Sequence, residues 1–316
     1  MKHVYRGSIA VVVAAILWSL DGLLRRQLFN LPPSVVVFWE HLLGLIILIP
    51  ILIGTLRKYK TFTRKQWLSI ILVSALSGAL GTYFYTSALG KVQYIPYSVV
   101  VLLQQLQPLF AILAGAILLR EQITKRFILY AGIALVAAYF VSFPDLRVHW
   151  DTGAGTLTAA LLAIGAAACW GSSTAFSKYT LRDTSFLHTT GARFAFTPIF
   201  AIILTLILGH GSSLGAITGL QWKYLLAITF STGLVALTIY YYGLQKILAS
   251  RSTILELTWP ISAVVIGFFA LHEQLTMTQW LGSIVLLATM YGVIREAQKI
   301  ELSKTQTTLS PVAPRL

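Results

Sequence analysis

The chain is organised as ten apolar stretches separated by short polar breaks. A helix crosses the hydrocarbon core of a bilayer in about 20 predominantly apolar residues, and each stretch falls near that length. The breaks carry charges or turn residues, such as Pro32 and Pro33 after the first stretch. The pattern predicts an all-α integral membrane protein with ten transmembrane helices, over residues 8–28, 33–54, 67–89, 95–119, 127–143, 156–179, 187–208, 222–245, 251–271 and 278–295.

The composition supports a membrane protein, whose outer surface contacts lipid and not water. Hydrophobic residues make up 57% and charged residues 11%, whereas an ordinary globular chain is about 25% charged. Intrinsic disorder, collagen, coiled coils and nucleic-acid binding are excluded as classes. The single cysteine, Cys169, cannot form an intramolecular disulfide. Its apolar surroundings favour a buried small residue over a reactive thiol.

The basic residues predict the orientation of the chain. Most of the 24 Lys and Arg residues fall on the side shared by the two termini and the even-numbered loops. Cytoplasmic loops carry such an excess, so we expect an inner-membrane protein with both termini in the cytoplasm. The first stretch begins after Lys2 and Arg6 and ends in Arg25 and Arg26, with no small-residue cleavage site. It is therefore interpreted as a retained helix and not as a signal peptide.

The two halves of the chain repeat each other. Trp18 recurs as Trp170 at a displacement of 152 positions, and Gln66 recurs as Gln221 at a displacement of 155. Two constant displacements that differ by one three-residue gap indicate an internal duplication. The predicted units are a first five-helix repeat, a second five-helix repeat and a cytoplasmic tail, over residues 1–150, 151–296 and 297–316.

The number of crossings in each repeat determines how the two copies are oriented. Five is odd, so the second copy enters the membrane upside down relative to the first. Inverted repeats place a ligand site near the midplane between them, and rocking one repeat against the other exposes that site to each side in turn. The duplication therefore predicts a carrier with a central cavity that works by alternating access.

A paired motif gives the chain a specific resemblance. Pro108 is followed by the run Arg120–Thr124 (REQIT), and its copy Pro260 is followed by His272–Thr276 (HEQLT). With these features the chain resembles ten-helix members of the drug/metabolite transporter (DMT) superfamily of the EamA type, over about residues 8–295. The resemblance implies that helices 1–4 and 6–9 line a cavity, that helices 5 and 10 lie outside it, and that the cargo is a small metabolite.

Glu256 is the leading candidate for contact with the cargo, since an ionisable group inside a bilayer is expensive. Gln104 precedes it by the 152 positions of the duplication, so we expect the two side chains to face each other. A structural hydrogen bond from Glu256 to a neighbouring helix is the alternative, as helix packing is for the aromatic residues. Pro108 and Pro260 are expected hinges, and the predicted substrate-binding residues are Trp18, Tyr83, Tyr97, Gln104, Gln105, Trp170, Tyr240, Glu256 and Trp259.

A second group of polar residues is assigned to coupling or gating. It comprises Asp21, Arg25, Glu40, His41 and Arg193. An Asp21–Arg25 ion pair at i, i+4 spacing is the simplest interpretation, and a gate shared with Glu40 is the alternative. Glu40 is expected to pair with Arg25 or Arg193, and His41 is either a proton relay or a hydrogen-bonded histidine.

The motif glutamates, Glu121 and Glu273, are interpreted as loop-organising or gating residues.

The sequence favours export of a small polar metabolite, with an amino acid or related amine as the expected cargo. Uptake of a quaternary amine such as choline is the alternative. An integral-membrane enzyme is disfavoured because no H-E-x-x-H, G-x-S-x-G or P-loop motif occurs. No catalytic residue, metal site or cofactor is predicted, and the expected partners are the cargo, the lipid bilayer and, as one possibility, a second copy of the chain. Proton coupling through Glu256 is a further hypothesis.

Overall fold

The computed structural model describes residues 2–91, 103–104, 106–142, 156–271 and 276–309. In these residues the regular secondary structure consists of helices, which are joined by turns and loops. The first half contains α1 (Lys2–Trp18), α2 (Asp21–Arg26), α3 (Pro33–Tyr59), α4 (Arg64–Val73), the π-helix η1 (Ser74–Gly81), α5 (Thr82–Leu89), α7 (Gln107–Leu119) and α8 (Lys125–Ser142). The second half contains α9 (Thr156–Leu181), α10 (Phe186–Ile207), the 3-10 helix η2 (Gly211–Leu214), α11 (Gly219–Ile228), the π-helix η3 (Thr229–Gly233), α12 (Leu234–Lys246), α13 (Ala249–Glu256), α14 (Thr258–Leu271) and α15 (Met277–Leu309).

Within the described residues, seven continuous helical segments are long and apolar enough to cross a membrane. They are His3–Arg26, Pro33–Tyr59, Arg64–Leu89, Thr158–Leu181, Phe186–Ile207, Gly219–Lys246 and Met277–Glu296. Several elements join into one span: α1 with α2, α4 with η1 and α5, and α11 with η3 and α12. Each of the ten apolar stretches contains at least one helix in the described residues, which confirms the all-α membrane fold, while the count of ten crossings stays a prediction.

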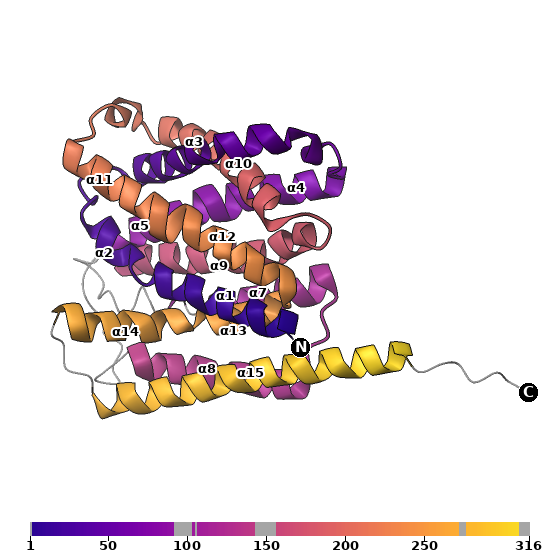
Figure 1. Ribbon diagram of the computed structural model, residues 1–316. Helices are drawn as coiled ribbons and strands as arrows, with labels where there is room; N and C mark the ends of the chain where they lie inside the picture. Colours follow the sequence, from indigo (N-terminus) through magenta and orange to yellow (C-terminus); the bar gives the residue numbers. More distant parts are fainter. Residues whose placement is uncertain (1, 92–102, 105, 143–155, 272–275, 310–316) are drawn as a thin grey trace, which may run out of the picture.

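Helices of the two halves pack in matching pairs (Figure 1). Under the duplication α1 corresponds to α9, and the span α4–η1–α5 corresponds to α11–η3–α12. The structure packs α1 along α12 and packs α9 along α4, η1 and α5. In addition α3 packs on α10 and α8 packs on α15, so these corresponding helices contact each other. A two-fold relation between the repeats produces this pairing.

Contacts at the ends of the helices show that the repeats are inverted. Gly7, near the start of α1, lies against Gly243 and Lys246 near the end of α12. Lys178, near the end of α9, donates to the carbonyl oxygens of Leu244 and Gln245 in that same region of the chain. The start of α1 and the end of α9 therefore lie together, and these corresponding helices run in opposite directions. The start of α1 and the end of α15, the first and last described elements, lie at this end of the molecule, which we call the end of the termini (Figure 1).

The duplication also extends to the local structure of the third helix in each repeat. Thr63 and Gln66 form a capping box at the start of α4, and Thr218 and Gln221 form the same box at the start of α11. The side-chain and backbone bonds of such a box satisfy N–H groups that the first helical turn leaves unpaired. The π-helices η1 and η3 then begin at positions that are also 155 apart. Both copies therefore begin with the same cap and widen at the same place.

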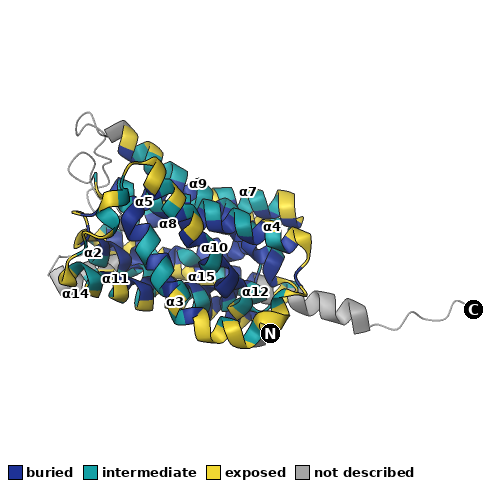
Figure 2. Cartoon of the chain, turned by 90° about the horizontal axis from the view of Figure 1, so that it is seen from above, coloured by how far each residue is buried: buried dark blue, intermediate teal, exposed yellow. Residues whose placement is uncertain are grey.

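Exposed residues lie at the periphery of the bundle and buried residues toward its centre (Figure 2). Many of the exposed side chains are large and apolar, while many polar and charged side chains are buried. Ile117, Ile207 and Met277 are each more than two-thirds exposed. Asp21 and Arg193, by contrast, are 7% and 8% exposed. This arrangement is the reverse of that in a soluble protein, because lipid solvates the outside and charged groups must find partners in the interior.

Candidate central binding site

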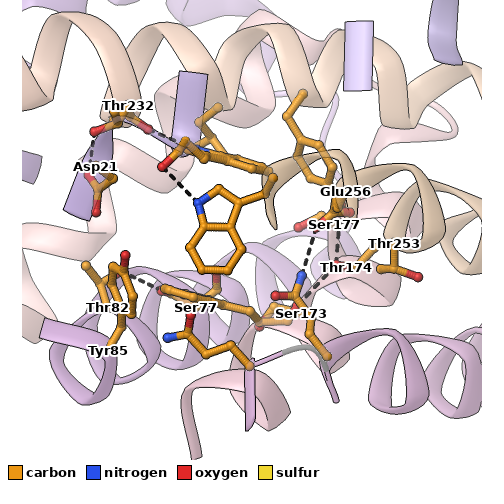
Figure 3. Close-up of a pocket in the computed structure, with 18 of the residues that line it drawn as sticks. Asp21, Ser77, Thr82, Tyr85, Ser173, Thr174, Ser177, Thr232, Thr253 and Glu256 are labelled. Atoms are coloured by element: carbon orange, nitrogen blue, oxygen red, sulfur yellow. Dashed lines mark hydrogen bonds between the residues drawn. The ribbon is translucent and has the colours of Figure 1, made fainter. Parts of the chain in front are cut away.

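A cavity of about 190 Å³ lies between the two repeats (Figure 3). Its lining comes from α1, α2, α3, η1, α5 and α7 of the first repeat and from α9, α10, η3, α12, α13 and α14 of the second. Among the described residues, none from α8 or α15 contributes to the lining. The expectation that the fifth and tenth helices lie outside the cavity agrees with this arrangement.

Two matching aromatic pairs form part of the cavity wall. Trp18 packs on Tyr240 with ring centroids 5.1 Å apart, and Trp170 packs on Tyr85 at 5.2 Å. The tryptophans are 152 positions apart and the tyrosines 155, so the pairs are related by the duplication. Trp18, Trp170 and Tyr240 were predicted at this site. Tyr85 was not, although the displacement of 155 from Tyr240 is a signal that points to it.

Each tryptophan also binds the π-helix of the opposite repeat. The indole N–H of Trp18 donates to the carbonyl oxygen of Thr232 at 2.9 Å, and that of Trp170 donates to the carbonyl oxygen of Ser77 at 3.1 Å. Gly81 leaves room for the second indole, because a Cβ there would lie 2.8 Å from its nitrogen. The two rings are therefore held at defined positions by contacts that cross between the repeats.

Glu256 lies at the end of α13, where the ninth helix is interrupted before α14. Tyr240 donates its hydroxyl to Oε1 of Glu256 at 2.8 Å, and the Gln107 amide donates to Oε2 at 2.8 Å. Gln104 lines the same cavity, but the amide bonded to Glu256 is that of Gln107, about one helical turn further along. Residues at i and i+3 share a helix face, and this spacing was the available signal for Gln107.

The ends of the interrupted helices carry the other predicted residues of this region. Pro108 lies in the first turn of α7 and Pro260 in the first turn of α14, and both line the cavity. At the start of a helix, proline lacks only an N–H that would be unpaired in any case. Trp259 donates its indole N–H to the carbonyl oxygen of Trp18 at 3.2 Å and also lines the cavity.

A buried ionic network closes the end of the cavity that lies away from the termini. Arg25 hydrogen-bonds Asp21 through Nε, Glu40 at 2.7 Å through Nη2, and Thr86 at 3.2 Å through Nη1. Thr232 donates its hydroxyl to the second oxygen of Asp21. The Asp21–Arg25 pair and the Glu40–Arg25 pair, both considered from the sequence, therefore occur in a single cluster. It joins α2, α3, α5 and η3.

Arg193 has a different environment. It donates to the Tyr241 hydroxyl and the Ser77 hydroxyl, both at 2.9 Å. Within the part of the chain that the structure describes, no carboxylate lies within ion-pairing distance of Arg193, and its Nε has no hydrogen-bond partner. The alternative Glu40–Arg193 pair is therefore not formed. His41 lies nearby, with Nδ1 2.9 Å from the carbonyl oxygen of Val37.

The remaining predicted residues lie elsewhere. Tyr83 is not part of the cavity lining and packs beside Phe84 instead. Tyr97, Gln105 and Glu273 lie outside the described residues. Glu121 caps the start of α13, where its carboxylate accepts from the backbone N–H groups of Ala249 at 2.7 Å and Ser250 at 3.0 Å. No cluster of three or more metal-ligating side chains occurs among the residues with described positions.

Comparison with known proteins identifies several full-length relatives. The chain is 33% identical over 297 residues to the riboflavin transporter ImpX of Fusobacterium nucleatum, covering 93% of this chain and 99% of the relative. It is 23% identical over 274 residues to a riboflavin transporter of Brucella anthropi, covering 84% and 89%. It is also 24% identical over 275 residues to Protein LicB of Haemophilus influenzae, covering 85% and 90%.

Two further comparisons concern the fold and the family. A solved crystal structure matches with a TM-score of 0.72 and 17% identity, covering 93% of this chain and 98% of the other, which shows a shared fold. The EamA-like transporter family matches the chain twice, over residues 5–143 and 157–295. Together with the inverted repeats and the cavity between them, this double match shows that the chain belongs to the EamA-like transporter family, a group of multi-pass membrane transporters.

Proposed function

We propose that this transporter carries riboflavin, or a closely similar flavin, across the inner membrane by alternating access, with both termini in the cytoplasm. The observation that carries the proposal is the pair of matching Trp–Tyr contacts on the cavity wall. Aromatic faces bind a flat ring system by offset stacking worth about 0.5–1.5 kcal/mol beyond the area buried. Two relatives that match most of the chain are named riboflavin transporters, and this supports the same cargo class.

The size of the cavity supports a site that changes shape during transport. Sites for drug-sized ligands have volumes of about 300–1,000 Å³, and the cavity here is about 190 Å³. A tricyclic flavin with its polyhydroxyl chain therefore requires the repeats to separate at one end. The helix interruption between α13 and α14 and the π-helices η1 and η3 are the places where the backbone departs from α-helical geometry and can absorb such a movement.

Two features act as gates in this proposal. The cluster of Asp21, Arg25 and Glu40 closes the outer end of the cavity, and the Glu121 cap on α13 ties the repeats together at the end that faces the termini. Glu256 serves as the proton-coupling group, because Tyr240 and Gln107, the hydrogen-bond donors that hold its oxygens, are both neutral. Neutral donors remain compatible with the protonated and the ionised carboxyl.

Export of an amino acid is a second candidate, and a specific observation favours it. Arg193 has no carboxylate partner among the residues with described positions, and the hydrogen-bond partners of Glu256 found there carry no positive charge. A zwitterion offers a carboxylate to the first and an ammonium to the second, and it fits the cavity without a large change in volume. A quaternary amine such as choline offers no group for Arg193, so the geometry favours it less.

Transport in proteoliposomes tests the proposed cargo directly. We expect vesicles containing the full-length protein to take up labelled riboflavin in a saturable manner, and excess unlabelled riboflavin to compete where amino acids and choline do not. The double variant Trp18→Leu/Trp170→Leu removes both stacking faces and is expected to abolish saturable uptake. Trp39, whose indole N–H binds the Leu214 carbonyl oxygen away from the cavity, supplies the control variant Trp39→Leu. If amino acids compete for transport and riboflavin does not, the proposed riboflavin cargo fails and the second candidate, an amino acid, takes its place.

A further inference from the structure

Three buried polar side chains of the cavity wall each have a polar atom without a hydrogen-bond partner. They are Nε2 of Gln104, Oγ of Ser173 and Nε of Arg193. Their residues are 7%, 2% and 8% exposed. Six buried side-chain atoms in the described part of the chain lack a partner, and half of them therefore lie around this one cavity.

The chemistry of these three atoms is uniform. The Gln104 amide nitrogen and the Arg193 nitrogen only donate hydrogen bonds, and the Ser173 hydroxyl can donate. A buried donor without an acceptor costs about 1–3 kcal/mol, and native proteins retain few such groups. Three unpaired donors on residues that line one cavity therefore favour a ligand group rich in acceptor oxygens.

Arg193 gives this set a positive charge and a fixed geometry. Its two terminal nitrogens are held by Tyr241 and Ser77, so that the guanidinium plane is fixed between α12 and η1. Among the described residues no carboxylate pairs directly with it, because Asp21 and Glu40 are bonded to Arg25. An oxygen with strong negative potential is therefore favoured beside Arg193.

We propose that Gln104, Ser173 and Arg193 form a subsite for the oxygen-bearing edge of the cargo, which in a flavin is the pair of carbonyl oxygens on its pyrimidinedione ring. The inference rests on the proposed carrier function and deepens it by orienting the cargo. The stacked Trp–Tyr pairs hold the flat ring, and the polyhydroxyl chain extends toward Glu256, whose oxygens accept from hydroxyl groups. A cargo carboxylate has the same acceptor chemistry and is the second source that the test distinguishes.

Binding to the purified full-length protein in detergent tests the subsite, with quenching of riboflavin fluorescence as the readout. We expect Arg193→Gln to weaken binding roughly tenfold or more, since a hydrogen bond to a charged group contributes about 1.5–3 kcal/mol and each 1.4 kcal/mol is a factor of ten. Ser173→Ala weakens it less. Arg251→Gln is the matched control, because Arg251 is another buried arginine with an unpartnered Nε that does not line the cavity.

An altered ligand assigns the contact to the ring edge. A riboflavin analogue with sulfur in place of one ring carbonyl oxygen is a poorer acceptor, so it should bind the native protein more weakly than riboflavin does. In Arg193→Gln this difference between the two ligands should largely disappear. The subsite would be overturned if the analogue bound more weakly than riboflavin by the same factor in the native protein and in Arg193→Gln. An unchanged riboflavin affinity in Arg193→Gln would also overturn it, and both results would leave the transport proposal intact.

The thermal midpoint of the ligand-free protein separates binding from a structural role. Arg193→Gln loses the hydrogen bonds to Tyr241 and Ser77 but also removes a buried charge that has no carboxylate partner in the described residues. Because these two effects offset each other, the variant should melt close to the temperature of the native protein. A clear drop would assign Arg193 to helix packing and contradict the proposal. Arg193→Lys keeps the charge without the planar fork, and we expect intermediate riboflavin affinity from it.

Amino acids and their methyl esters form the last arm of the test. If amino acids bind and riboflavin does not, the flavin function fails. The subsite is then supported when esterification weakens binding to the native protein but not to Arg193→Gln, and it is overturned when both proteins respond equally. Failure of both ligand classes to bind the native protein would count against the subsite and the proposed cargo together.

Discussion

The two ends of the central cavity are built from corresponding positions but from different chemistry. At the end away from the termini, Arg25 reaches Thr86 on the third helix at 3.2 Å. Ser177, 152 positions after Arg25, bonds Tyr241, 155 positions after Thr86, at 2.9 Å. The same contact between helices therefore joins a charged guanidinium to a hydroxyl group at one end and two hydroxyl groups at the other.

The difference extends to neighbouring positions. Asp21 corresponds to Ser173, and in the described part of the chain the ion pairs around Arg25 have no equivalent near Ser177. The cations there bind neutral groups, since Arg193 donates to the Tyr241 hydroxyl and Lys178 to backbone carbonyl oxygens. Arg193 stands close to the hydroxyl end without a carboxylate. After duplication, the backbone contacts of the two repeats remained alike while the charges came to differ. We expect the ionic end to hold its closed form more strongly than the hydroxyl end, and the cargo to meet its positive group near the hydroxyl end.

Replacement of Arg25, the arginine at the centre of the ionic cluster, should have the largest effect on stability and transport. Arg25→Gln leaves the buried carboxylates of Asp21 and Glu40 without their cation, a change that costs about 3–5 kcal/mol in buried pairs. We expect a large drop in the thermal midpoint and loss of transport. The matched change at the other end, Ser177→Ala, removes one neutral hydrogen bond and should cost about 0.5–1.5 kcal/mol. Similar losses in the two variants would show that the ends do not differ as described.

A second substitution tests whether Arg25 stabilises the protein by pairing with Glu40. The double variant Arg25→Gln/Glu40→Gln removes one of the two stranded carboxylates, so it should be more stable than Arg25→Gln alone. Coupling of this kind is measured by a double-mutant cycle on thermal or denaturant unfolding. Additive losses would mean that Arg25 and Glu40 do not act as a pair.

A smaller effect is expected where Glu121 joins the repeats. Glu121→Ala removes the carboxylate that accepts from the N–H groups of Ala249 and Ser250. Loss of a helix cap costs about 0.5–2 kcal/mol, and the end that faces the termini should open more readily. Faster labelling of a cysteine placed at Ser250, compared with the same cysteine in the native background, measures this opening. An unchanged labelling rate would exclude Glu121 from the gate.

The tryptophan contacts should respond alike in the two repeats. Trp18→Phe and Trp170→Phe keep an aromatic face but remove the indole N–H that binds a π-helix carbonyl oxygen. Each should cost about 0.5–1.5 kcal/mol, with riboflavin affinity changed less than by replacement with leucine. Thermal unfolding of both variants beside Trp39→Phe measures the effect. A cost confined to one of the two cavity tryptophans would show that the symmetry of the contacts does not extend to their energies.

The smallest effect on stability is expected at Glu256. Its equivalent in the first repeat is an amide, Gln104, so Glu256→Gln makes the two repeats alike at this position. The Tyr240 hydroxyl can still donate to the new side chain, and we expect a change in unfolding free energy below about 1 kcal/mol. Accumulation of cargo driven by a proton gradient should nevertheless be lost, while exchange without a gradient continues. Full gradient-driven accumulation by this variant would exclude Glu256 from proton coupling.

The fold and part of the cavity lining were predictable because duplication leaves a constant displacement in the sequence. Trp18, Trp170 and Glu256 were placed at the cavity from that displacement and from the cost of polar groups in a bilayer. Tyr83, a predicted substrate-binding residue, is not among the residues that line the cavity, whereas Tyr85 lines it. The π-helix η1 ends just before both residues, and its wider turn rotates the side chains that follow relative to α-helical spacing.

The hydrogen-bond and ion-pair partners of the cavity residues were harder to predict from the sequence than their placement at the cavity. The sequence indicated the face that carries Gln104, but the choice of Gln107 as the partner of Glu256 depends on how far the interrupted helices are shifted along each other. Likewise, Arg25 had two available carboxylates and binds both, which a pairwise reading of the sequence did not settle. Such choices depend on distances between helices, and a single sequence carries little information about these.

Alternating access requires that the two repeats enclose one cavity that opens to both sides of the membrane. Leu237 lines that cavity, so Leu237→Cys in a Cys169→Ala background provides a single reporter thiol. Its labelling by a membrane-impermeant reagent can be measured in right-side-out and inside-out vesicles, with and without riboflavin. We expect labelling from both sides and protection by riboflavin in both vesicle orientations. Labelling from only one side under all conditions would contradict alternating access.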